Sequence, residues 1–229
     1  MWLMASRNRV ELAQRFFDAA KSTGMVTRGK LLVKESEVSI YSEINIPDNW
    51  QIIGTKSDGM GDKFRELFHA YSMDSWVGIV NDDFVPESKG WDVELVNEAL
   101  KDPCFVSCAD GTGNHKKRQC GATVWNGGLV REVGYLYPKD FNHLYFDDAW
   151  EILGKSTGCW KVREDVLVRH LHPFGGGGEV DETHLKSYSD ENWAHDKAAF
   201  DRWNKYIRPA SILKIKNIIE REKNDKATQ

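Results

Sequence analysis

Residues 76–83 read Trp76-Val77-Gly78-Ile79-Val80-Asn81-Asp82-Asp83, an uncharged run that ends abruptly in two acids. A short continuous apolar run of this kind is typical of a strand buried on both faces, as in a parallel sheet covered by helices. Working outward, strand and helix patterns alternate. Strands are predicted at 2–4, 30–34 and 105–108, and helices at 10–20, 60–73 and 93–100. This alternation predicts an α/β fold.

The second half of the chain is more mixed. Its patterns predict strands at 122–125 and 166–172 and helices at 146–153, 194–206 and 211–223. A length of 229 residues suits one domain with a sizeable core. We therefore expect a single domain over residues 1–208, followed by a charged helical tail over residues 209–229.

Composition narrows the class of protein. Hydrophobic residues make up 41%, charged residues 29%, and the net charge is −4, which gives no overall attraction to nucleic acid or acidic membranes. The sequence contains no run of eighteen apolar residues, so no membrane-spanning helix is predicted. The apolar start, Met1–Ala5, is too short for a signal peptide, so we expect a buried first strand and a cytoplasmic protein.

Four cysteines occur, and reduced thiols are the expectation for a cytoplasmic protein. Cys104 and Cys108 lie on a predicted strand, where four residues span roughly 13 Å. Two thiolates on one zinc ion lie within about 4 Å of each other. The spacing therefore argues against a zinc site.

The acids that follow residues 76–80 are the first candidate site. Ligands of α/β sheets bind beyond the carboxyl ends of strands. Adjacent carboxylates such as Asp82 and Asp83 repel each other, and a divalent cation that prefers oxygen ligands offsets that repulsion. The alternative is a turn or helix cap, which Asn and Asp also favour.

The segment Gly78–Pro86, followed by Gly90-Trp91-Asp92, resembles the acidic metal-binding motif of GT-A glycosyltransferases. It is most similar to small family-two-like members, many of them encoded by bacteriophages. The resemblance implies a Rossmann-like nucleotide-diphospho-sugar transferase fold, with a mixed, mostly parallel sheet flanked by helices. It also implies that Asp83 binds Mn²⁺ or Mg²⁺ bridging the donor phosphates, while Asp82 or Asn81 orients the ribose or a coordinated water.

A second acidic pair, Asp147-Asp148, opens the predicted helix at 146–153. Asp148 with Glu151 could form a capping box. The pair also resembles the acidic motif that follows the acceptor loop in GT-A enzymes, which implies that Asp148, or else Asp147, is the general base. A carboxylate at a helix N-terminus is stabilised in its charged form and can accept a proton from an acceptor hydroxyl.

Two late histidines, His170 and His172, share one face of a predicted strand because they are two residues apart. Either could be a structural residue. In GT-A proteins a late histidine often completes the metal shell, so the resemblance implies His170 or His172 as a ligand, with His170 preferred. The loop Gly175–Glu179, with Asp181 and Thr183 after it, could close over the donor or could be simply mobile.

The resemblance to GT-A enzymes implies that the nucleotide binds just past the first strand, at Ser6, Arg7 and Arg9. Arginine forks suit a base or a diphosphate, although solvated charges at a helix start are the alternative. The stretch Gly59–Lys63 resembles the glycine-and-lysine segment of the same enzymes and suggests Lys63 as a donor contact. Residues 34–37 replace the acid with which most relatives read the nucleobase, so the base stays open.

These residues together predict a metal-dependent hexosyl- or pentosyltransferase that uses a nucleotide-sugar, with a UDP-sugar as the expected donor. The acceptor stays unidentified; a modified DNA base and a glycan are the candidates, with Trp125 and Asn126 as the candidate contacts. Further candidates are Tyr135, Tyr137 and the basic loop 115–118. The alternatives are an inactive carbohydrate- or partner-binding module on the same fold, or a nucleotidyltransferase. A phage-encoded enzyme would act in the host cytoplasm; stereochemistry and oligomeric state stay open.

Overall fold

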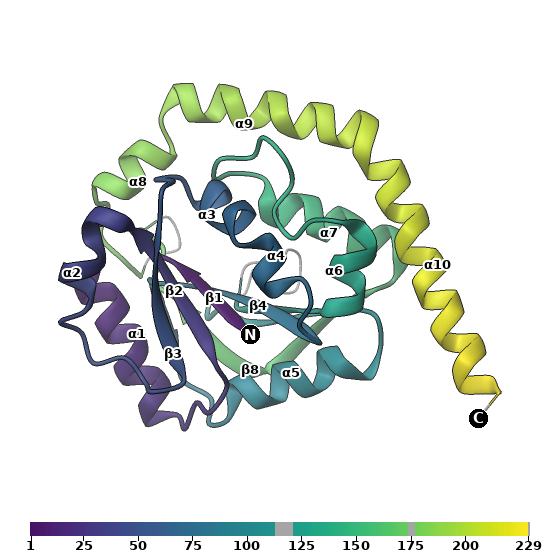
Figure 1. The fold of residues 1–229 in the computed structure, drawn as a ribbon, viewed down its shortest axis with the longest axis horizontal. Coiled ribbons are helices and arrows are strands. Elements are labelled where there is room, and N and C mark those ends of the chain that lie inside the picture. The colour runs from purple at the N-terminus through teal and green to yellow at the C-terminus, as the bar shows by residue number, and fades with distance from the viewer. Residues whose placement is uncertain (113–120, 174–176, 229) are drawn as a thin grey trace.

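A computed structural model describes residues 1–112, 121–173 and 177–228 (Figure 1). Within these ranges the strands form a mixed sheet in the order β3-β2-β1-β4-β7-β6-β8-β5. Their bounds are β1 Trp2–Ala5, β2 Gly29–Lys34, β3 Trp50–Thr55, β4 Trp76–Asn81, β5 Phe84–Pro86, β6 Phe105–Ala109, β7 Thr123–Asn126 and β8 Trp160–His170. The predicted α/β class is confirmed.

Most neighbouring strands are parallel. β3, β2, β1 and β4 pair in parallel, and β6 pairs in parallel with β8. β7 runs antiparallel to both β4 and β6, and β5 runs antiparallel to β8. The first strand, β1, lies inside the sheet, and Trp2, Leu3 and Met4 have no exposed surface. The N-terminal segment is therefore the buried strand that its apolar sequence predicts.

One glycine shows how closely the central strands are packed. A Cβ atom on Gly78 in β4 would overlap the ring of Trp2 in β1. The Trp2 ring lies between two other indoles, with centroids 5.8 Å from Trp76 and 4.9 Å from Trp91. A side chain at position 78 would have to displace this cluster, so the glycine inside the strand has a packing reason.

Helices surround the sheet (Figure 1). Their bounds are α1 Val10–Ser22, η1 Glu35–Glu37, α2 Val38–Tyr41, α3 Met60–Glu66, α4 Phe68–Tyr71, α5 Trp91–Lys101, α6 Gly127–Val133, α7 Phe146–Thr157, α8 Glu182–Ser187, α9 Asp190–Arg202, the π-helical η4 Trp203–Ile207 and α10 Arg208–Ala227. In the described residues, no helix is both long and apolar enough to cross a bilayer.

The C-terminal helices form an arc around the edge of the molecule, with α9 passing through η4 into α10 (Figure 1). α10 contacts α6 and α7 and buries Ser211, Ile215 and Ile218. Tyr135 Oη lies 3.0 Å from Ser211 Oγ, which ties this helix to the loop after α6. The expected tail at 209–229 therefore coincides with a helix whose first half is packed on the domain.

Candidate functional site

The carboxyl ends of β1 and β4 meet at one edge of the sheet. The two strands are parallel neighbours with Ala5 opposite Asn81, so the residues that follow each strand lie close together. Ser6 Oγ donates a 2.6 Å hydrogen bond to Asp82 Oδ2. Arg9 Nη1 lies 3.2 Å from Asp82 Oδ1. Four residues that the sequence places at a donor site are thus assembled at this edge.

A second backbone pairing brings a late histidine to the acidic cluster. β5 runs antiparallel to β8 with Phe84 opposite His170, and Leu171 N–H donates a 3.0 Å bond to the Asp83 carbonyl. His170 Nε2 consequently lies 3.3 Å from Asp83 Oδ2. The His170 ring also packs edge-on against Phe84, with 4.7 Å between centroids. The structure therefore joins the two residues that the sequence assigned to one metal ion.

The Asp83–His170 contact fits a divalent cation. Asp83 is 4% exposed, and its Oδ1 has no hydrogen-bond partner among the described residues. A buried carboxylate oxygen in this state costs free energy that a cation would offset. Nowhere in the described ranges do three His, Cys, Asp or Glu side chains form a complete cage. A cation held here would therefore take further ligands from a bound molecule or water, as Mg²⁺ commonly does.

The two acids differ in pKa. Burial, together with the charge of Asp83, raises the pKa of Asp82 to about 6. Burial also acts to raise the pKa of Asp83, but the contact with His170 and the charge of Arg9 outweigh it and leave that pKa lowered. Asp83 is therefore the better anion of the two, as a direct metal ligand must be.

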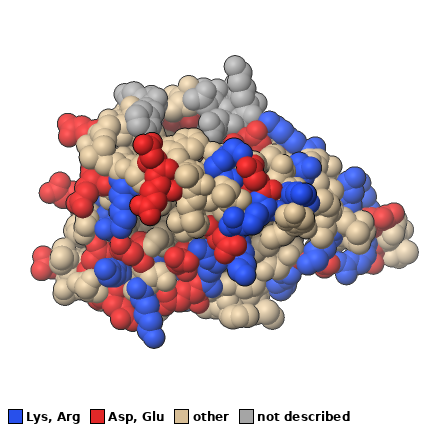
Figure 2. Space-filling model, turned by 90° about the horizontal axis from the view of Figure 1, so that it is seen from above, with Lys and Arg blue, Asp and Glu red and all other residues tan. Residues whose placement is uncertain are grey.

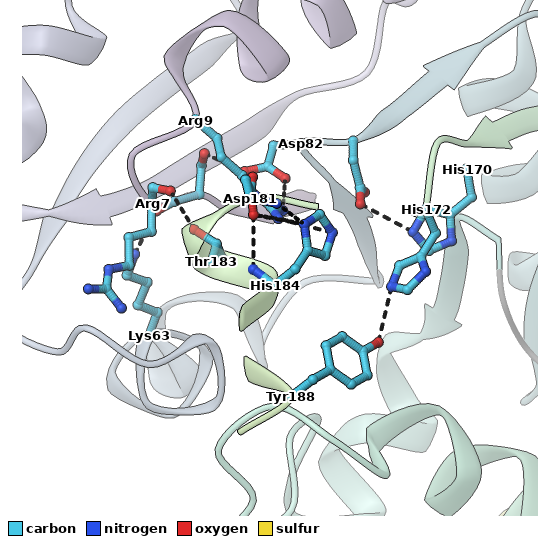
Figure 3. A network of polar contacts seen from close by, with 12 residues as sticks. Arg7, Arg9, Lys63, Asp82, His170, His172, Asp181, Thr183, His184 and Tyr188 are labelled. Carbon is cyan, nitrogen blue, oxygen red and sulfur yellow. Dashed lines mark hydrogen bonds and ion pairs between the residues drawn. The ribbon is translucent and has the colours of Figure 1, made fainter. Parts of the chain in front are cut away.

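Arg9 joins three distant segments (Figure 3). Besides Asp82, its guanidinium contacts Asp181 through Nε and Nη2, at 2.7 and 2.8 Å. Nη2 also lies 2.9 Å from His184 Nδ1. Burial lowers the pKa of Arg9, but Asp181 and Asp82 outweigh that effect and hold the guanidinium charged. The start of α8 is thereby fixed over the end of β1.

The second late histidine has a different partner. His172 Nε2 lies 3.0 Å from the Tyr188 hydroxyl, and the His172 ring centroid is 5.1 Å from that of His170. Burial and the neighbouring His170 lower the pKa of His172 to about 4. Both histidines belong to this site (Figure 3). His170 is the one in contact with Asp83.

The remaining residues predicted for the donor lie to one side. Arg7 points away from the Arg9–Asp181 pair (Figure 3), and its Nη1 lies 3.2 Å from Asp58, which also pairs with Lys186. Lys63 is 1% exposed and donates a 2.7 Å bond to the Ser6 carbonyl. Lys63 therefore supports the loop after β1 from below. A direct contact between Lys63 and the donor stays a prediction.

The glycine in the middle of Gly59–Lys63 has a packing role. Gly61 N–H donates a 2.9 Å bond to the Asn142 carbonyl. A Cβ at position 61 would overlap the Phe141 carbonyl oxygen and would lie 2.7 Å from the Tyr137 ring. The glycine lets α3 approach the loop that precedes α7 closely.

The second acidic pair lies in the first turn of α7. Tyr145 is the N-cap, in the left-handed conformation with φ 63°, and no side chain caps the helix. The expected capping box is therefore wrong, because Asp148 is the third residue of the helix rather than its cap. Asp147 and Asp148 are both half-buried.

One histidine lies within electrostatic range of both acidic clusters. Burial and Arg9 lower the pKa of His143, while Asp196, Asp147 and Asp83 act to raise it. The loop around His143 is held by Asp196, whose side chain is fully buried. Its carboxylate accepts backbone bonds of 2.7–2.8 Å from residues 142–144. The charges of Asp83 and Asp147 therefore both act on His143.

Comparison with known proteins identifies this architecture. No protein-family model and no curated protein sequence matches the chain. A mannosyltransferase from Pyrobaculum calidifontis, solved with GDP-Man and Mn²⁺, matches with a TM-score of 0.58 at 10% identity, over 93% of this chain and 72% of that one. The glucosyl-3-phosphoglycerate synthase of Mycobacterium tuberculosis, solved with Mn²⁺, UDP and phosphoglyceric acid, gives 0.56 at 12% identity, over 86% and 77%.

The chain has the GT-A fold. The same fold carries a 4-diphosphocytidyl-2C-methyl-D-erythritol synthase from Anaerococcus prevotii, which matches with a TM-score of 0.53 at 11% identity, over 88% of this chain and 95% of that one. At such low identities the similarity establishes the GT-A fold and leaves the reaction to be argued from the residues.

Two candidate acceptor contacts are placed elsewhere in the GT-A fold. Trp125 in β7 is fully buried, and its ring centroid lies 5.5 Å from that of Trp150. Asn126 caps α6 by accepting a 2.9 Å bond from Gly128 N–H. The expectation that Trp125 lines an acceptor site is wrong, because its ring fills the core. An acceptor contact of Asn126, which is half-buried at the end of β7, stays a prediction. Tyr137 is likewise buried, and residues 115–118 lie outside the described ranges.

Two residues of this site are not predicted from the sequence. His184 and Tyr188 contact Arg9 and His172 respectively, and neither was a candidate. A local signal exists for one of them, since Asp181 caps α8 by accepting a 2.9 Å bond from His184 N–H. That signal predicts a helix start and does not reveal the approach to Arg9.

Proposed function

We propose that this chain is a metal-dependent glycosyltransferase, a hexosyl- or pentosyltransferase that uses a nucleotide-sugar donor. The observation that carries the proposal is the contact between Asp83 and His170 at the carboxyl end of β4, with Asp83 Oδ1 buried and open to a further partner. The structures that match with bound Mn²⁺ also hold UDP or GDP-Man. We propose UDP as the nucleotide of the donor.

Asp83 and His170 would hold Mn²⁺ or Mg²⁺, with His172 as the neighbouring imidazole. A cation bound there would neutralise the diphosphate that leaves when the sugar–phosphate bond breaks. Carboxylate and imidazole together suit Mn²⁺, and a lone carboxylate would suit Mg²⁺ better. Asp83 keeps the charge that this task requires, since its pKa is lowered by His170 and Arg9 against the effect of burial.

The chain's own residues would bind the donor and move a proton. Arg9 presents a guanidinium fork of the kind that binds phosphate oxygens in pairs. Ser6, Asp82 and Asn81 would orient the ribose or a coordinated water at the same edge of the sheet. Asp148, or Asp147 beside it, would accept the proton of the acceptor hydroxyl as that oxygen attacks the sugar carbon.

The experiment that tests this proposal is calorimetry of the purified protein with UDP and GDP, in Mn²⁺, in Mg²⁺ and after treatment with EDTA. We expect a nucleoside diphosphate to bind only when the cation is present. The binding nucleotide then fixes the donor series for turnover assays. If no nucleoside diphosphate binds under any of these conditions, the proposal fails.

A second candidate is a nucleotidyltransferase, because a diphosphocytidyl-transferring synthase shares the fold over 88% of this chain. Both reactions would use the same acids at the carboxyl end of β4. Product analysis separates them: sugar transfer releases a nucleoside diphosphate, whereas nucleotidyl transfer releases pyrophosphate. Metal-independent binding of glycans with no turnover would instead support the inactive module.

The proposal also includes a cytoplasmic setting, the host cytoplasm if the gene is carried by a bacteriophage. Cys104, Cys108 and Cys159 are free thiols in the described residues, as expected in a reducing compartment. The phage relationship rests on the resemblance of the segment Gly78–Pro86 alone.

A further inference from the structure

Trp193 differs from the other tryptophans of the chain. It is 45% exposed, whereas the other eight tryptophans are buried or half-buried. Five of them, Trp2, Trp91, Trp125, Trp150 and Trp203, are almost completely buried. An exposed indole in a chain that buries most of its tryptophans is a candidate contact residue.

The position of Trp193 relates it to the candidate base. Its ring meets Tyr145 edge-on, with 5.5 Å between centroids and an interplanar angle of 86°. Tyr145 also stacks on Phe200 of α9, with 4.9 Å between the ring centroids. Tyr145 is also the N-cap of α7, immediately before the turn that carries Asp147 and Asp148. The aromatic pair therefore borders the acidic pair.

The face of α9 that carries Trp193 is the one that orders this loop. Trp193, Asp196 and Phe200 follow one another at helical spacing, so they share a face. Asp196 binds the backbone of residues 142–144, and Phe200 packs on Tyr145. Tyr145 is held in the left-handed conformation that few tyrosines adopt. A strained aromatic residue next to acids is a feature of functional sites.

Charge around the pair decides which ligand it suits. Asp190 and Glu191 are exposed in the same helix. Burial raises the pKa of the Tyr145 hydroxyl most, and the charges of Asp148 and Asp201 also act to raise it. The nearby Lys197 Nζ lies 2.7 Å from Oδ1 and 2.6 Å from Oδ2 of Asp201. An acidic surface repels a polyanion, while an uncharged sugar ring is not repelled.

Figure 2 shows the charged side chains on one face of the molecule. This view looks from above relative to Figure 1. Acidic and basic side chains are interspersed on this face, and the described residues form no continuous basic surface there. The basic segment 115–118 lies outside the described ranges. Of the two acceptors that the sequence left open, the surface around Trp193 favours the glycan over DNA.

We propose that the exposed ring of Trp193, which Tyr145 meets edge-on, is an aromatic platform on which a neutral sugar ring of the acceptor stacks beside Asp147 and Asp148. This inference rests on the proposed function and names its acceptor class, a carbohydrate. The flat apolar face of the Trp193 ring would cover the C–H face of a sugar. The adjacent carboxylates would accept hydrogen bonds from its hydroxyls, including the one that attacks the donor.

The test uses protein saturated with UDP and Mn²⁺ on a printed array of neutral oligosaccharides, with labelled single- and double-stranded DNA measured in parallel by fluorescence anisotropy. Trp193→Ala removes the exposed ring, and Trp193→Phe keeps an aromatic face. Tyr206→Ala is the matched control, because Tyr206 is also an exposed aromatic residue, at 68%, in η4. Since both positions are exposed, all three variants should keep the wild-type melting temperature.

We expect glycans to be retained by the wild type, by Trp193→Phe and by Tyr206→Ala, and the affinity of Trp193→Ala for them to fall about tenfold. The proposal is overturned if no glycan is retained, if Trp193→Ala binds glycans as the wild type does, or if DNA binds more tightly than any glycan. Calorimetry with UDP on the same preparations separates the two failures. UDP binding without glycan binding refutes the platform alone, whereas the absence of UDP binding refutes the proposed transferase.

Discussion

Arg9 and Asp181 form an ion pair through two parallel hydrogen bonds, from Nε to Oδ2 at 2.7 Å and from Nη2 to Oδ1 at 2.8 Å. The pair connects the loop after β1 to the N-cap of α8 across 172 positions of sequence. A diphosphate would use the same two donors of the guanidinium fork. A donor that binds Arg9 in this way must therefore displace the Asp181 carboxylate.

Replacing Asp181 with Asn tests this competition. Asparagine is as good an N-cap as aspartate, so α8 should keep its start, while the charge that competes for Arg9 is lost. We expect the affinity for UDP in the presence of Mn²⁺, measured by calorimetry, to rise about fivefold. Glu182→Gln, which removes the neighbouring exposed charge, is the control and should leave the affinity unchanged. Weaker UDP binding in Asp181→Asn would mean that Asp181 supports the donor site instead.

The metal ligands can be tested separately. Asp83→Asn removes the charge that faces His170, and His170→Ala removes the imidazole. We expect UDP affinity in Mn²⁺ to fall about a hundredfold in Asp83→Asn and at least about tenfold in His170→Ala. The residual binding should no longer respond to EDTA. Asp165→Asn, at an exposed ion pair with Arg163 on β8, is the control. A metal-dependent affinity that survives in Asp83→Asn would reject the assigned ligand.

The sequence allowed the centre of the fold to be predicted because burial leaves a plain pattern. The run at 76–80 and the helical spacing at 10–20 correspond to β4 and α1. The edge strand β3, Trp50–Thr55, was missed, since an edge strand packs less apolar surface and has a weaker pattern. The first half of β8 was missed as well, because charged residues such as Lys161 and Arg163 lie there in ion pairs.

The candidate site was predictable only where its members resemble a motif or follow a strand. Asp83 and His170 met these conditions and lie in contact. The approach of Asp181 to Arg9 depends on how the last third of the chain folds back, and no local pattern encodes it. Trp125 shows the converse error, since residue type alone does not distinguish a core indole from one that meets a ligand.

The cysteines give a chemical test of the core. Burial raises the pKa of Cys104 and of Cys108 to about 12, and that of Cys159 to about 11. The thiolate is the reactive form, so at mildly alkaline pH these thiols stay protonated and shielded. We expect a disulfide reagent such as DTNB to titrate no more than one of the four cysteines in the native protein and all four after unfolding in guanidinium. Rapid modification of two or more native thiols would contradict the burial.

Asp196 should contribute to stability through the loop before α7. Its buried carboxylate accepts the N–H groups of residues 142–144. Asp196→Ala leaves these donors without an acceptor, and we expect the free energy of unfolding to fall by about 3 kcal/mol, measured in urea. Asp201→Ala, which breaks an exposed ion pair in the same helix, should cost less than about 1 kcal/mol. Equal losses in the two variants would show that the loop bonds contribute little.

The two glycines of Gly59–Lys63 distinguish packing from phosphate binding. A Cβ at Gly61 would overlap the Phe141 carbonyl oxygen, whereas one at Gly59 would meet only Asp62 Oδ2 at 3.6 Å. We expect Gly61→Ala to lower the free energy of unfolding by about 2 kcal/mol or more, and Gly59→Ala to cost less than about 1 kcal/mol. Thermal unfolding and UDP calorimetry should be measured on both. If either alanine instead abolished UDP binding while stability stayed unchanged, the glycines would belong to a phosphate loop, and the packing explanation of Gly61 would be wrong.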